Sequence, residues 1–178
     1  MRLLLPSVIV ALYCFFSLVL PLRAGFVPKA LLGLALMAAG LKYVFYQVVG
    51  GGFFRPVLPV PVMLAAEALY AALLVLFFLA LIKDAAGLGL RAARLFGLPW
   101  HLPFTPGLRC ALLMVLALGS GIWGTWQAVR VPDVRTVEVA LPKLPAELEG
   151  FTLVQLSDLH IGPVQKAAWL SEVVRKVN

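Results

Sequence analysis

The stretch FTLVQLSDLHIGP, residues 151–163, places a carboxylic acid and an imidazole two positions apart, at Asp158 and His160. Alternate side chains of an extended chain point to the same side, so these two could reach one cation. A mixed oxygen and nitrogen donor set suits manganese, iron or zinc better than calcium. Because Asp also commonly caps helices, the Asp-x-His triplet is informative only in its context.

Asp158 and His160 lie between a predicted strand and a predicted helix. Residues 151–157 form a continuously apolar run typical of a buried strand, and residues 134–141 alternate apolar and polar side chains like a half-buried one. In strand–loop–helix units, ligands and metals gather beyond the carboxyl ends of the strands. The helix expected after the Gly-Pro turn has one apolar face, formed by Ala167, Leu170, Val174 and Val177.

The rest of the chain has the composition of a membrane protein. Of its 178 residues, 62% are hydrophobic and 13% are charged, with a mean hydropathy of +1.00. Soluble domains carry about a quarter charged residues. The net charge of +7 comes from cations placed between apolar segments. This distribution favours contact with a lipid bilayer and anionic lipid headgroups, and it does not indicate nucleic-acid binding.

Four apolar segments are long enough to be predicted as membrane-spanning helices, since about 20 helical residues cross roughly 30 Å of hydrocarbon. A secretory signal peptide is the alternative for the first segment, which lacks a small-x-small cleavage pattern. A short interfacial helix is expected within 84–104. The predicted spans are 3–22, 29–49, 61–82 and 108–129.

Two ionisable residues lie inside the predicted spans. Lys42 and Glu67 flank the same short hairpin, so they are expected at similar depth and paired as a structural clamp. A proton or ion relay is the alternative role. Pairs of small residues at helix-packing spacing predict close helix contacts: Ala35 with Ala39, Ala117 with Gly121, and Ser120 with Gly124.

The distribution of cations predicts the orientation in the membrane. The loops that follow the first and third predicted spans lie on one side of the membrane, and they carry more Arg and Lys than the opposite side. The positive-inside rule therefore places these loops in the cytoplasm. Both termini, and residues 131–178 with them, are expected on the extracytoplasmic side of the cell membrane.

The stretch LEGFTLVQLSDLHIGP resembles the first motif of the calcineurin-like metallophosphoesterases, and the layout resembles their membrane-anchored bacterial branch. The resemblance implies a hydrolase with an αββα sandwich and two divalent metals (Mn, Fe or Zn) that activate water for attack on a phosphate ester or pyrophosphate bond. Asp158 and His160 would be ligands of the first metal, and Gly162 would allow a tight loop beside them. Membrane anchoring makes a phosphorylated, lipid-linked substrate attractive.

The sequence departs from this family after its first motif. The Gly-Asp-x-x-Asp, Gly-Asn-His and Gly-x-His motifs that supply the other ligands do not occur in it. The expected architecture is mainly α: a four-helix transmembrane bundle over 1–130, followed over 131–178 by the first β–β–α portion of the sandwich. This implies an N-terminal fragment of a longer enzyme, inactive by itself. The alternative is a small multi-pass membrane scaffold or transport component with no catalytic activity.

Overall fold

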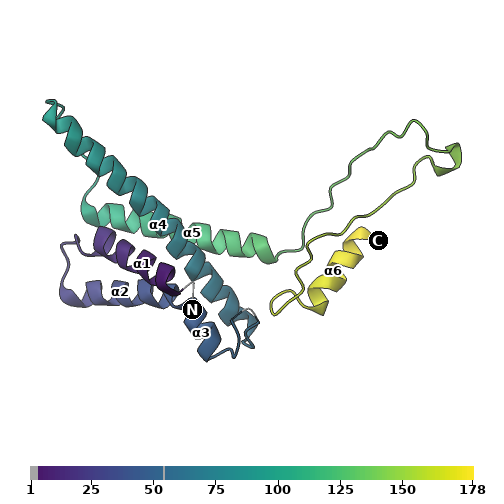
Figure 1. Ribbon diagram of the computed structural model, residues 1–178, viewed down its shortest axis with the longest axis horizontal. Helices are drawn as coiled ribbons and strands as arrows, with labels where there is room; N and C mark the ends of the chain where they lie inside the picture. The colour runs from purple at the N-terminus through teal and green to yellow at the C-terminus, as the bar shows by residue number, and fades with distance from the viewer. Residues whose placement is uncertain (1–3, 54) are drawn as a thin grey trace. The chain divides into compact units, whose positions relative to one another are not determined.

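The computed structural model describes residues 4–53 and 55–178, most of which are helical (Figure 1). The mainly α prediction is therefore confirmed. The chain divides into two compact units, called here the helical unit (Met1–Ala128) and the C-terminal unit (Val129–Asn178). The first helices are α1 (Leu4–Cys14), the π-helix η1 (Phe15–Val19), α2 (Phe26–Gly40), α3 (Lys42–Val48), α4 (Val60–Leu95) and α5 (Pro106–Val129).

The first apolar segment forms a shorter helix than expected. α1 continues into η1, and together they run over Leu4–Val19. At about 1.5 Å per residue they extend roughly 24 Å, which is less than the roughly 30 Å of a bilayer core. The helix ends before Pro21, which has no backbone N–H with which to continue the helical hydrogen bonds. The expected span 3–22, whose first residue lies outside the described residues, is too long.

The second apolar segment is broken. α2 and α3 meet at Leu41 with a bend of 62°. The break follows Gly40, where a Cβ atom would lie 3.0 Å from the carbonyl oxygen of Ser7 and 3.3 Å from Cβ of Ala11. Glycine thus lets the end of α2 approach α1 closely, and the two helices run side by side (Figure 1). The continuous span expected over 29–49 is replaced by this bent pair.

Helix α4 is longer than expected. It continues through Lys83 and Asp84, where the span was expected to stop, and reaches Leu95. Residues 84–95 are mostly good helix formers without proline, so nothing there interrupts the helix. The helix ends at Leu95 and is followed by Gly97, whose φ of +81° is a left-handed conformation that glycine adopts readily. A separate interfacial helix within 84–104 is therefore not formed.

The core of the helical unit lies where α1, η1, α2, α4 and α5 meet. Helix α5 crosses α4 at Gly121, where an added Cβ atom would clash with the carbonyl oxygen of Ala68. Ala117, one turn earlier, is also buried. The Ala117 and Gly121 contact is thus confirmed. Gly124 has nothing within 4 Å of a Cβ position, so the contact predicted there is wrong.

Among the described residues, the helices α4 and α5 are long and apolar enough to cross a membrane. If the bent pair α2–α3 is counted as one span, the number of candidate spans is three. The predicted four-helix bundle is therefore not supported among the described residues. The fourth expected span, 108–129, corresponds to α5.

The C-terminal unit contains no strand among its described residues, so the expected β–β–α start is a helix preceded by two extended segments. Residues 134–141 and 151–157 run outward and back, reversing around η2 (Ala146–Leu148) and Gly150 (Figure 1). No backbone hydrogen bond joins the two segments in the described structure. The strand predictions are not supported in the described residues, because a strand needs neighbouring strands and a two-stranded ribbon alone is marginally stable.

The helix expected after the Gly-Pro turn is confirmed as α6 (Ala167–Val177). Its buried face is rotated from the expected one, however. Val173 is 3% exposed, whereas Val174, placed on the apolar face from the sequence, is 41% exposed. Leu170 and Val177 are partly buried beside Val173.

Candidate functional site

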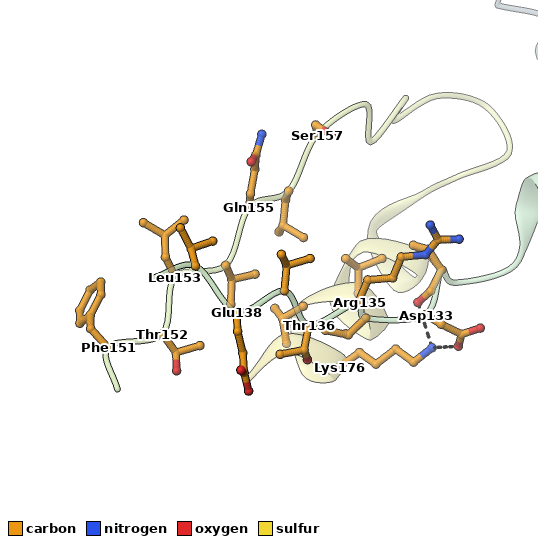
Figure 2. Close-up of a pocket in the computed structure, with 18 of the residues that line it drawn as sticks. Asp133, Arg135, Thr136, Glu138, Phe151, Thr152, Leu153, Gln155, Ser157 and Lys176 are labelled. Atoms are coloured by element: carbon orange, nitrogen blue, oxygen red, sulfur yellow. Dashed lines mark hydrogen bonds and ion pairs between the residues drawn. The ribbon is translucent and has the colours of Figure 1, made fainter. Parts of the chain in front are cut away.

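The two extended segments and α6 surround a hollow of about 780 Å³ within the C-terminal unit (Figure 2). Thr136, Glu138, Leu153 and Gln155 line it, from both segments. This space lies where strand pairing was expected. Side chains such as Val137 and Leu153, each 77% exposed, are consequently left largely open to solvent.

Asp158 and His160 follow directly after the second extended segment, but neither lines the hollow. Both adopt left-handed backbone, with φ of +53° at Asp158 and +45° at His160. Non-glycine residues seldom do so, although Asp and His are among the more tolerant types. The backbone is therefore not extended here, and the sequence reasoning that put both side chains on one side of a strand does not hold. Both residues are exposed.

The surroundings of this motif do not complete a metal site. Among the described residues no group of three or more His, Cys, Asp and Glu side chains is placed to hold a metal ion. The loop after the motif is closed by Gly162, whose N–H donates to the carbonyl of Gln165 over 3.1 Å. A Cβ on Gly162 would make only an ordinary contact at 3.7 Å, so this loop does not require glycine.

One lysine side chain ties α6 to the beginning of the C-terminal unit through two hydrogen bonds. Lys176 Nζ donates to Asp133 Oδ1 over 2.7 Å and to the carbonyl of Pro132 over 2.9 Å (Figure 2). The hydrogen bond and the positive charge of Lys176, with Arg130 nearby, lower the pKa of Asp133 below its ordinary value. On α6, the hydrogen bond from Arg175 lowers the pKa of Glu172 in the same way.

The helical unit contains the ion pair predicted between Lys42 and Glu67. Lys42 Nζ lies 2.8 Å from Glu67 Oε2, and the pairing is thus confirmed. The lysine side chain is 4% exposed and the glutamate side chain 44%. Whether the pair acts as a clamp or a relay stays a prediction.

Sequence reasoning missed the aromatic surroundings of this pair. Lys42 Nζ lies 4.3 Å and 4.4 Å from the ring centres of Tyr43 and Tyr70, a cation–π arrangement. The Tyr46 hydroxyl donates to Glu67 Oε1 over 3.0 Å. Tyrosines next to Lys42 and four residues after it, with another three residues after Glu67, were the available signal.

Comparison with known proteins points to one kind of relative. Two curated proteins called "Transmembrane protein with metallophosphoesterase domain" are similar to this chain. The protein from Danio rerio is 36% identical over 67 residues, covering 38% of this chain and 15% of the relative. The protein from Bos taurus is 35% identical over 71 residues, covering 40% and 16%.

The chain thus matches only about a sixth of the length of these relatives. No family model matches it, and no solved structure matches it. The two names, together with the apolar helices, support a relation to transmembrane proteins that carry a metallophosphoesterase domain.

Proposed function

We propose that this chain forms the membrane anchor and the first metal-binding motif of a calcineurin-like, metal-dependent phosphoesterase that hydrolyses phosphate ester or pyrophosphate bonds. The observation that carries the proposal is the Asp158-x-His160 motif in left-handed backbone, between an extended segment and α6. Sparsely populated backbone conformations cluster at functional sites. The names of the two similar proteins support the same reading.

The donor atoms fit part of a metal site. Asp158 offers carboxylate oxygens and His160 an imidazole nitrogen, a combination suited to Mn, Fe or Zn. Two divalent ions would need several more ligands than these, and the described residues do not supply them. No catalytic step is therefore assigned to these 178 residues, which we expect to be inactive alone.

The exposed side chains of the C-terminal unit support a sandwich fold for the whole enzyme. Val137, Val139, Phe151 and Leu153 are each at least 69% exposed. Such apolar side chains along two extended segments are suited to burial by further strands and helices. We propose that residues 131–178 are the β–β–α beginning of an αββα domain and that 1–130 are its membrane domain.

The placement in the membrane is part of the same proposal. Pro21 of the first loop and Leu102 of the third line one cavity of the helical unit, which supports their lying on the same side. The excess of cations on these loops favours the cytoplasm for them, with both termini outside in a multi-pass protein. An enzyme held there would reach a phosphorylated substrate linked to lipid.

The decisive experiment isolates from native membranes the proposed longer enzyme that contains these residues, and compares it with its Asp158→Ala and His160→Ala variants. Hydrolysis of bis(p-nitrophenyl) phosphate with Mn²⁺ and the bound Mn content are measured. Losing even a partner of a metal ligand costs 10–100-fold, so each variant should lose at least about 100-fold in rate and should bind less metal. Glu147→Ala, an exposed acid outside the motif, is the matched control and should change neither.

The second candidate function is a multi-pass membrane scaffold or transport component without catalytic activity. It is favoured by the helical unit, which buries a core of its own without the C-terminal unit. An unmodified protein that neither hydrolyses the phosphodiester nor retains Mn²⁺ would favour this candidate. Normal rate and normal metal content in the Asp158→Ala variant would remove the site assignment.

A further inference from the structure

The helical unit contains a cavity of about 420 Å³ where η1, the later part of α4 and the beginning of α5 meet. This volume lies within the range of small-molecule sites, roughly 300–1,000 Å³. Its walls are partly apolar, with Phe16, Leu18 and Leu88 among them, and they carry the cations Lys83, Arg91 and Arg109 with one acid, Asp84.

The negative charge of Asp84 is already compensated within the protein. Lys83 Nζ lies 2.6 Å from Asp84 Oδ1. The hydroxyls of Tyr13 and Ser17 donate to Asp84 Oδ2 over 2.7 Å and 2.6 Å. Lys83 also donates to the carbonyl of Ser17 over 2.9 Å. The acid and this lysine therefore neutralise each other and fix the wall formed by η1, a π-helical turn of a kind frequent at functional sites.

Two arginines of the cavity remain without such compensation. Neither Arg91 on α4 nor Arg109 on α5 forms an ion pair with any residue in the described ranges. Arg109 is partly buried. The cavity consequently carries an excess of two positive charges. A guanidinium presents a planar fork of donors that matches the oxygens of a phosphate group.

We propose that this cavity binds the phosphate of an anionic membrane phospholipid, with Arg91 and Arg109 as its ligands. A lipid is favoured over free phosphate because apolar side chains form the other walls and because the cavity lies among apolar helices that could lie in a bilayer. The site would be separate from the Asp158 motif, and the proposal does not depend on the phosphoesterase function.

The experiment uses the whole protein in detergent, incubated with phosphatidylglycerol or phosphatidylcholine, and counts retained lipid by native mass spectrometry. Phosphatidylglycerol should be retained preferentially. Loss of hydrogen bonds to charged groups predicts that the Arg91→Gln/Arg109→Gln variant retains at least about tenfold less of it. The control, Arg23→Gln/Arg94→Gln, removes the same charge from exposed positions outside the cavity and should bind like the unmodified protein.

Three results would overturn the proposal. Equal losses in both double variants would mean that general surface charge attracts the lipid. Equal retention of both lipids would exclude recognition of an anionic phospholipid. Complete displacement of the lipid by inorganic phosphate would assign the cavity to a soluble phosphate compound.

A measurement without variants covers the case in which the glutamine substitutions prevent folding. A ligand that binds only the folded state raises the melting temperature. The melting temperature of the unmodified protein should therefore be higher in phosphatidylglycerol than in phosphatidylcholine. Equal melting temperatures in the two lipids would also overturn the proposal.

Discussion

The helical unit and the C-terminal unit differ in how far they bury apolar and charged side chains. In the helical unit Cys14 and Val19 are completely buried, and Lys42 has a carboxylate partner. In the C-terminal unit Val137 and Leu153 are exposed, and the ion pairs lie at the surface. Helices satisfy their own backbone hydrogen bonds, whereas extended segments need neighbours for theirs. The difference shows why the helical unit buries apolar side chains and the two extended segments leave theirs exposed.

The largest expected effect is the contrast in amide hydrogen exchange between the two units. Amides of residues 152–157 should exchange almost as fast as an unstructured peptide. Those in the middle of α4 should be protected by roughly 5 kcal/mol, the order of a whole domain's stability. Exchange measured by mass spectrometry in detergent tests this, with a synthetic peptide of the sequence 151–158 as the unprotected reference. Protection of 152–157 equal to that of α4 would mean that paired strands form.

Removing the acid of the buried ion pair should be the most damaging single change in the helical unit. Glu67→Leu leaves the Lys42 ammonium buried without its carboxylate, which should cost about 3 kcal/mol, the low end for buried pairs because the carboxylate is half-exposed. Lys42→Leu should cost less, and the double variant less than Glu67→Leu. Unfolding of each variant in detergent gives these values. Additive losses would show that the two side chains act independently.

The crossing of α5 over α4 should be sensitive to side-chain size at one position. Gly121→Val places new atoms against the backbone of Ala68 and Ala72, and overpacking of this kind costs about 1–3 kcal/mol. Gly119→Val is the matched control, since a Cβ there meets nothing within 4 Å. Unfolding under the same conditions compares them. Equal stability of the two variants would contradict the close crossing.

The smallest expected effect is the pH dependence of the contact between α6 and residue 133. The pKa of Asp133 is lowered in the folded chain, so the contact contributes fully above the ordinary Asp pKa of about 3.9 and is lost as pH falls through the lowered value. Acid titration of the α6 circular dichroism signal should show this loss. Asp133→Asn should remove it, whereas Glu172→Gln, which removes the other acid with a lowered pKa, should retain it.

The apolar helices and the Lys42–Glu67 pair could be predicted from sequence because hydropathy and charge are local signals. The bend at Leu41 and the π-helical turn η1 could not. The bend depends on how α1 and α2 pack at Gly40. The π-helical turn depends on a hydrogen bond from the N–H of Leu20 to the carbonyl of Phe15, five residues earlier. The expected end of the third span at residue 82 is too early for α4. Consecutive charges such as Lys83 and Asp84 indicate the end of an apolar span, but here the two side chains pair with each other inside a continuous helix.

For the candidate site, the sequence predicted the helix after the motif but not the backbone of the motif itself. The apolar run over 151–157 indicates what a strand would bury, not whether a partner strand is present. The left-handed conformations of Asp158 and His160 have no counterpart in composition or spacing. The roles of these two residues remain a prediction from the motif.

Because α4 is one continuous helix, the distance between its polar groups can be compared with the thickness of a bilayer core. Glu67 belongs to the polar cluster around Lys42, and Lys83 to the polar cluster around Asp84. These two residues are sixteen positions apart on α4, a rise of about 24 Å. A bilayer core of roughly 30 Å would submerge at least one cluster, and tilting the helix would only shorten the interval. A chain held by both clusters therefore matches a thin bilayer, or thins the lipid around it, and would partition away from thick, sterol-rich membranes.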